Sequence, residues 1–388
     1  MSVEVIRVPL QEVTDLVRPN EVLPFRVFDA QGRLLLSEGH VISGEEQVHA
    51  LIERGAWAEH DRVEDVRAAR GLASPGDPRI AVVRETNLFD RWEQAIWSLD
   101  TLLRKLRGGT AQADDLIRAA DAQVALVDRD PDVALFMANR QEGLRYALYA
   151  LTHSLHTATL VLLTGRALGL PPPLVASAVR AAITMNAAMA ELQATMAEQR
   201  DPPSAQQMAL IRSHPVRGAA MLRAAGVTDA AWLAAVEQHH EQTGGAGYPA
   251  GLASPHALAH LLRACDVYAA KITPRAFRAA LPPQAAARQL FQQEQGSPLA
   301  STLIKSVGVY PPGDFVTLKS GEIGIVTRRA QAGRGMQVAT LSDARGRPVA
   351  DTHHRDTADP AYAIAGPVTD RSGFPRVLPE RVYGVLAA

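Results

Sequence analysis

Five side chains in this chain of 388 residues have the chemistry to bind a metal ion, and they fall on four separate helical segments. Imidazole and carboxylate groups are the usual protein ligands of zinc, iron and manganese. A site built from four helices would take one or two ligands from each. Spacing alone also allows each isolated histidine to be an ordinary core or surface residue. The candidate ligands are His153, His214, His239, His240 and Asp266.

A glycine-rich segment directly follows the adjacent histidine pair. Three of the four residues from 244 to 247 are glycine, which permits positive φ and close approach of the backbone to a ligand. Tyr248 and Pro249 then stiffen the exit from the loop. A helix cap followed by a tight turn accounts for one glycine but not for all three. We therefore predict a ligand or partner contact at this loop, through Gly245, Gly247, Tyr248 and Pro249.

Helices must position these residues, and the sequence predicts them from about 84 to 300. Apolar residues recur at three- and four-residue intervals between Leu88 and Leu103. Ser204 with Gln207 forms a capping-box pattern, and Thr228 is the predicted cap of the helix that leads to the histidine pair. The further helices that we expect span 111–128, 131–140, 142–168, 172–190, 204–224 and 228–241.

The N-terminal part, residues 1–75, is predicted to be a small α+β module. Strand-forming runs at 23–28 and 33–36 surround a turn signal that ends in Gly32. The Ser-Pro-Gly-Asp-Pro segment at 74–78 breaks any regular structure and marks the predicted boundary.

The C-terminal part, residues 301–388, is predicted to be a small β-rich module. A hairpin signal at 319–322 lies between two apolar runs, and further strands are expected at 338–341 and 349–351. The predicted fold class is therefore mainly α, with a helical central domain at 84–300 between two small modules.

The composition argues against a nucleic-acid-binding, membrane-bound or secreted protein. The formal net charge is -1, from 40 basic and 41 acidic residues, so no global field attracts a nucleic acid polymer or an anionic membrane. Cys265 is the single cysteine, which fits a reducing compartment. The N-terminus lacks the pattern of a secretory signal, and no apolar run reaches about 18 residues, the segment 148–170 coming closest. We expect a cytoplasmic protein without a membrane span.

Over residues 145–280 the chain resembles the HD-GYP family, whose characterised members hydrolyse cyclic di-GMP. Ser213-His214-Pro215 looks like the family's His-Pro segment, and His153 looks like part of its first ligand helix. Asp266 looks like the last metal-binding aspartate, and the segment 275–278 looks like the Arg-Pro-Tyr-Arg that follows it. The most specific match is the family's loop string, present here as His239, His240, Glu241, Gly245, Gly247, Tyr248, Pro249, Gly251 and Leu252. The resemblance implies a helical HD-type central domain.

The chain departs from the family at the pair that gives the family its name. Met185 and Asn186 stand where a His-Asp pair is usual, and Met189 stands where a lysine is usual. Gly244 replaces the loop aspartate. An asparagine is neutral and cannot offset the repulsion between two cations, and a thioether is a poor ligand for iron or manganese. A two-metal centre that activates a water is therefore not expected.

The resemblance and the departure together favour a non-catalytic signalling regulator. It would bind cyclic di-GMP or a protein partner, such as a diguanylate cyclase-type protein or a second copy of the chain, with Tyr248 as an exposed anchor. The surviving histidines imply a single divalent metal, iron, manganese or zinc, or no metal. Two alternatives stay open, namely an active phosphohydrolase with an altered or mononuclear centre and a purely structural helical module.

Overall fold

The structure, a computed structural model, divides the chain into two compact units, Met1–Arg84 and Glu85–Ala388. Each unit is described by itself. The residues that the structure describes are 7–18, 21–30, 32, 34–36, 38–42, 44–70, 87–139, 148–349, 351–368 and 377–384.

The first unit is a small antiparallel sheet with two helices, as predicted. Its strand order is β1-β4-β2-β3, and Leu10, Phe25 and Ile42 are fully buried in its core. The strand predicted at 23–28 is shorter than expected, and the predicted break at 74–78 lies outside the described residues. The elements are β1 (Arg7–Pro9), β2 (Val27–Phe28), β3 (Leu34–Leu36), α1 (Glu45–Glu53), β4 (Trp57–Glu59) and α2 (His60–Ala69).

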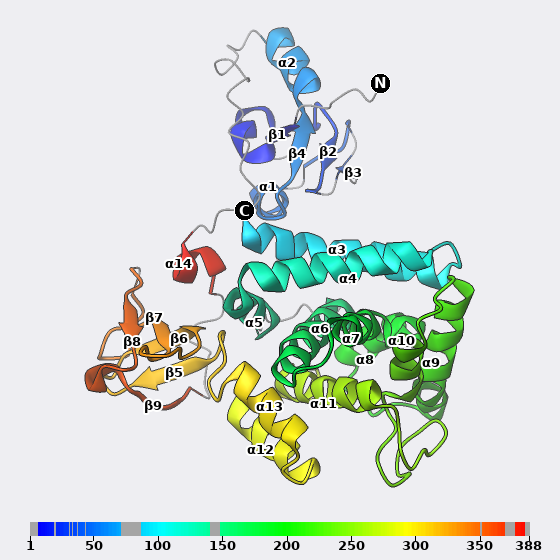
Figure 1. The fold of residues 1–388 in the computed structure, drawn as a ribbon. Helices are drawn as coiled ribbons and strands as arrows, with labels where there is room; N and C mark the ends of the chain where they lie inside the picture. The colour runs from blue at the N-terminus through cyan, green and yellow to red at the C-terminus, as the bar shows by residue number, and fades with distance from the viewer. Residues whose placement is uncertain are drawn as a thin grey trace. The chain divides into compact units, whose positions relative to one another are not determined.

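The second unit is mainly helical, which confirms the predicted fold class. The helix α6 is buried along most of its length because α7, α11 and α13 pack around it (Figure 1). The helices that precede the histidine pair are α3 (Leu88–Arg107), α4 (Ala113–Arg129), α5 (Pro131–Asn139), α6 (Tyr149–Ala167), α7 (Pro172–Thr184), α8 (Ala190–Glu198), α9 (Ala205–Ala224) and α10 (Ala230–Gln238). Those that follow are α11 (Ala257–Ile272), α12 (Pro283–Gln293) and α13 (Pro298–Val307).

Helix boundaries differ from the prediction at α7 and α10, and the helix expected over 228–241 ends at Gln238. The helix expected over 172–190 ends at Thr184, and a 3-10 turn, Ala187–Met189, separates it from α8. The cap of α10 is Asp229 rather than Thr228, because the Asp229 carboxylate accepts a hydrogen bond from the backbone N–H of Trp232 at 3.0 Å. The capping box of Ser204 and Gln207 on α9 is present as predicted.

A five-stranded antiparallel sheet of order β8-β7-β6-β5-β9 completes this unit. The predicted hairpin is confirmed, with the backbone N–H of Leu318 donating to the carbonyl of Glu322 at 2.9 Å. The strand expected at 349–351 was wrong in position, since the partner of β7 is His354–Asp356. Ion pairs of Arg328 with Asp130, between α4 and α5, and of Arg329 with Asp132 of α5 join the end of β6 to these helices. The elements are β5 (Phe315–Leu318), β6 (Ile323–Arg328), β7 (Gln337–Thr340), β8 (His354–Asp356), β9 (Ile364–Pro367) and α14 (Pro379–Tyr383).

Among the described residues, one helical stretch, Pro172–Glu198, has the length and apolar content of a membrane span, and 67% of its most apolar window is buried inside the unit. Core helices of soluble proteins pass the same test, so this finding is weak evidence for a membrane.

Candidate metal centre

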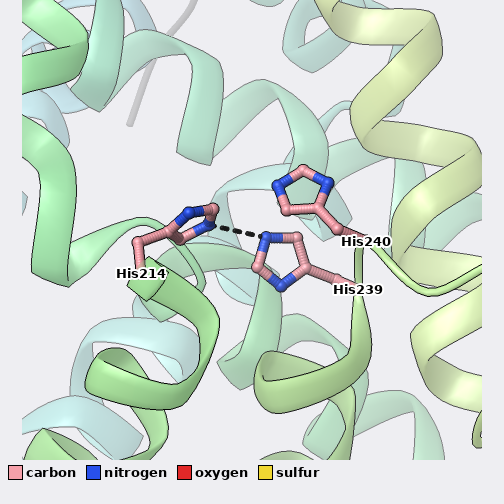
Figure 2. Close-up of side chains that lie close together, drawn as sticks. All are labelled: His214, His239 and His240. Atoms are coloured by element: carbon pink, nitrogen blue, oxygen red, sulfur yellow. Dashed lines mark hydrogen bonds between the residues drawn. The ribbon is translucent and has the colours of Figure 1, made fainter. Parts of the chain in front are cut away.

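Two helices bring His214 and His239 face to face. His214 lies in the middle of α9, and His239 caps the C-terminal end of α10. Both residues are fully buried. Each ring is fixed by its own helix: His214 Nδ1 lies 2.6 Å from the carbonyl oxygen of Ile211, and His239 Nδ1 lies 2.7 Å from that of Val236. The two Nε2 atoms then meet at 3.1 Å (Figure 2).

This arrangement places two lone pairs against each other. A carbonyl oxygen can only accept a hydrogen bond, so the Nδ1 atoms of both rings carry the proton. In neutral rings both Nε2 atoms are then acceptors, and neither can donate to the other. Two nitrogens bound to one cation at about 2.0–2.1 Å lie roughly 3 Å apart, which fits the observed separation. The pair therefore has the chemistry of two ligands to a shared cation.

His240 supplies a third imidazole. The ligand atoms of His214, His239 and His240 all lie within 4.8 Å of one another. Burial lowers the pKa of all three rings, to about 3 for His214 and well below the ordinary value for His240. The three rings are therefore neutral near pH 7, which is the form in which imidazole binds a metal.

His153 and Asp266 form a second, separate pair. His153 Nε2 lies 2.7 Å from Asp266 Oδ1, and the His153 ring is 2% exposed. Burial raises the pKa of the Asp266 carboxyl, but the hydrogen bond with His153 opposes burial, and the pKa stays below its usual range. The Asp266 carboxylate also favours the protonated forms of the three clustered histidines, so it lies within electrostatic reach of them.

The five predicted ligands thus form a triad and a separate hydrogen-bonded pair. His156, which the sequence places on the same face of α6 as His153, is also buried, and burial lowers its pKa to about 3. Within the described part of the chain, His156 Nε2 has no hydrogen-bond partner. Helical spacing pointed to this ring, but nothing in the sequence distinguished it from a core histidine.

Met185 and Asn186 lie at the end of α7, next to the helices that carry the triad. Met185 is fully buried and Asn186 is 4% exposed. A Cβ on Gly218 of α9 would lie 3.6 Å from the Met185 carbonyl oxygen, and Trp232 of α10 donates to Thr184 Oγ1 at 2.9 Å. The Asn186 side-chain oxygen is buried and has no hydrogen-bond partner among the described residues. The end of α7 therefore carries a neutral amide and a thioether, both buried, and it packs on the helices of His214 and His239.

Glu241 anchors the glycine-rich loop. Its side chain is buried, with 1% of the residue exposed, and its carboxylate accepts three backbone N–H groups of the loop, from Ala250 at 2.7 Å, Gly251 at 3.1 Å and Leu252 at 3.0 Å. The sequence identified Glu241 only as part of a family string. The structure gives it a positioning role, which is to close the loop that begins beside His240.

We expect Glu241→Gln to destabilise the protein by about 2–4 kcal/mol, because the amide keeps one acceptor oxygen and turns a donor group toward backbone donors. Urea unfolding followed by circular dichroism measures this free energy. The matched control is Glu237→Gln, whose partly exposed pair with Arg223 contributes less than about 1 kcal/mol. Equal unfolding free energies for the two variants would contradict the anchoring role.

The loop requires glycine at 247. An added Cβ would lie 2.4 Å from the backbone nitrogen of Gln242 and 2.5 Å from the carbonyl oxygen of His240. At Gly244 an added Cβ meets nothing within 4 Å, but its φ of 90° still favours glycine.

Tyr248 is half-buried, so the expectation of an exposed anchor was wrong. Its ring stacks on His240, with centroids 4.7 Å apart and planes at 24°. The guanidinium of Arg212 lies 5.7 Å from the centre of the Tyr248 ring. The exposed residues of the loop include Gln242, Thr243 and Pro249 instead.

Comparison with known proteins shows similarity to HD domains over the segment that contains this site. Residues 134–299 match the HD domain family. The cyclic di-GMP phosphodiesterase PA4108 of Pseudomonas aeruginosa is 29% identical over 276 residues, covering 68% of this chain and 64% of the relative, which is less than two-thirds of its length. The solved structure of Bd1817, an HDG"Y"P protein from Bdellovibrio bacteriovorus, covers 78% of this chain and 99% of that chain, with 17% identity and a TM-score of 0.49. The matched segment 134–299 contains every predicted ligand and the whole loop.

Proposed function

We propose that the chain is an HD-GYP-type, cytoplasmic cyclic di-GMP signalling protein that binds the dinucleotide without hydrolysing it; the match of residues 134–299 to the HD domain family and the similarity to a cyclic di-GMP phosphodiesterase support this. The observation that carries the proposal is that Met185 and Asn186 are buried at the end of α7, which packs on α10, while His214, His239 and His240 are still clustered. Such a protein keeps the binding site of a phosphodiesterase and lacks part of its catalytic apparatus.

His214, His239 and His240 would hold one divalent metal in this proposal. The metal would supply a Lewis acid for a phosphate oxygen. Hydrolysis also needs an activated water, and two cations held close together need a carboxylate to offset their repulsion. Asn186 provides no negative charge, and Met185 is too soft to bind iron or manganese well. The residues present therefore support binding of a phosphodiester better than its cleavage.

Two arginines beside the His153–Asp266 pair support a phosphate ligand. Arg275 Nη2 donates to the Tyr149 hydroxyl at 2.5 Å, and the Tyr149 ring stacks on His153 with centroids 5.3 Å apart. Burial and the neighbouring charge of Arg275 lower the pKa of Arg278. Cyclic di-GMP carries two phosphodiester groups, and guanidinium groups bind such anions by charge-assisted hydrogen bonds.

A second candidate function is an active phosphodiesterase with a mononuclear centre. The three clustered histidines, with the Asp266 carboxylate in electrostatic reach, favour it because one metal could still polarise a phosphate. This candidate predicts linear dinucleotide as a product.

We expect the metal-loaded protein to bind cyclic di-GMP in calorimetry and to release no linear dinucleotide or GMP in chromatography. Arg275→Gln should weaken binding about tenfold, because a charge-assisted contact to phosphate is lost. The control is Arg288→Gln on the exposed side of α12, which should bind as the unaltered protein does. Absence of binding would overturn the proposal, and product formation that is lost in His239→Ala would establish the active alternative.

A further inference from the structure

A cavity of roughly 400 Å³ lies between α3 and α4, and none of the described residues that line it is a histidine. This volume is in the range of small-molecule sites. Its lining is mainly apolar, with Leu99 from α3, Leu126 from α4, Leu155 from α6 and Ile183 from α7. None of the side chains described as lining it is acidic. The cavity is therefore suited to an apolar molecule without a positive charge.

Positive charge gathers at one end of this cavity. The helices α3 and α4 are joined by the short turn 108–112 and run side by side in opposite directions (Figure 1). Arg91 and Arg129 both line the cavity, and both lie on the helix ends remote from that turn. The opposite end is formed by small or apolar residues, such as Ala119 and Leu99. The cavity is thus polarised, with guanidinium groups at one end and a mainly apolar, half-open groove behind them.

The floor contains a second polar feature. Gln123 lines the cavity and is 2% exposed. Its Nε2 donates to Thr159 Oγ1 at 3.1 Å and faces the Leu155 carbonyl at 3.4 Å, which fixes the orientation of the amide. Its Oε1 has no hydrogen-bond partner in the described part of the chain. Gln123 therefore ties α4 to α6 and leaves one buried acceptor oxygen on the floor of the cavity.

We propose that this cavity binds a small amphipathic carboxylate, with its carboxylate at Arg91 and Arg129 and its apolar chain over Leu99 and Leu155. The span from Arg91 to Leu99 is about 12 Å at 1.5 Å per residue, which is roughly the length of an extended ten-carbon chain. Leu155 lies two residues after His153, and Ile183 lies two residues before Met185. A ligand in the cavity therefore contacts the same two helices that carry those residues.

The test uses the full chain and decanoate below its micelle concentration, with decylamine as a probe of equal length and opposite charge. We expect saturable one-site binding of decanoate in calorimetry, with decylamine at least tenfold weaker. Ala122→Trp should abolish binding, because Ala122 lines the cavity and a large ring fills it. Ala220→Trp, at an exposed position of α9, is the matched control and should bind normally.

Arg91→Gln separates the head-group assignment from cavity filling. Arg91 is exposed, so the variant should fold, and decanoate affinity should fall about tenfold while decylamine binding is not weakened. Absence of decanoate binding by the folded protein, or binding that survives Ala122→Trp, would overturn the site. Equal affinity for decanoate and decylamine, unchanged by Arg91→Gln, would overturn the anionic class of ligand.

Discussion

Replacement of His239 by alanine is expected to lower the affinity for a divalent metal by more than about 100-fold, since loss of an outer-shell partner alone costs 10–100-fold. His239 is fully buried and its Nδ1 proton is held by the Val236 carbonyl, so its Nε2 is presented to the cluster in one tautomer. Removing the ring leaves two imidazoles and relieves the opposed lone pairs of the His214 contact. Loss of this contact alone should therefore not lower the stability of the metal-free protein.

The measurement is equilibrium metal binding under anaerobic conditions with iron, manganese and zinc in turn, followed by elemental analysis. We expect one metal per chain in the unaltered protein and none retained by His239→Ala. The control is His49→Ala on the exposed surface of α1, where alanine also favours the helix. Equal metal content in the two variants would rule out the histidine triad as the ligand set. A parent protein that takes up no metal would point instead to the structural alternative.

Much of the helical framework could be predicted because its signals are local. The capping box at Ser204 and the apolar spacing from Leu88 depend only on neighbours in the sequence. The end of α7 at Thr184 was missed because nothing at 185–190 breaks a helix by residue type. The following turn packs on α9, so tertiary contacts decide this boundary.

The candidate site was predictable in its residues but not in its geometry. Spacing indicated His239 and His240, whereas the division into a triad and the His153–Asp266 pair depends on how four helices pack. The half-buried Tyr248 could not be foreseen, because its stacking on His240 depends on the loop closing around the Glu241 carboxylate. The cavity between α3 and α4 left no signal either, since alanines and arginines are ordinary residues of exposed helices.

Introducing a His-Asp pair at positions 185 and 186 is expected to raise both the metal content and the rate of hydrolysis. We expect the double variant Met185→His/Asn186→Asp to bind two metals per chain and to hydrolyse cyclic di-GMP more than about 100-fold faster than the parent. The new carboxylate would offset the repulsion between two cations, and the new imidazole would replace a thioether that binds iron or manganese poorly. Both positions are buried at the end of α7, beside the helices of His214 and His239. The measurement combines metal analysis with chromatography of the products.

The single variant Met185→His is the matched control, because it adds the imidazole without the charge and should keep one metal and no turnover. Burying a new aspartate costs stability when no cation is present, so thermal unfolding with and without metal must accompany the assay. A metal-dependent rise in melting temperature that is larger in the double variant than in the single one would show that the added carboxylate faces a cation. A folded double variant that still binds one metal would mean that positions 185 and 186 do not face the centre. In that case, the lack of a carboxylate at 186 would no longer support the proposal that the protein does not hydrolyse cyclic di-GMP.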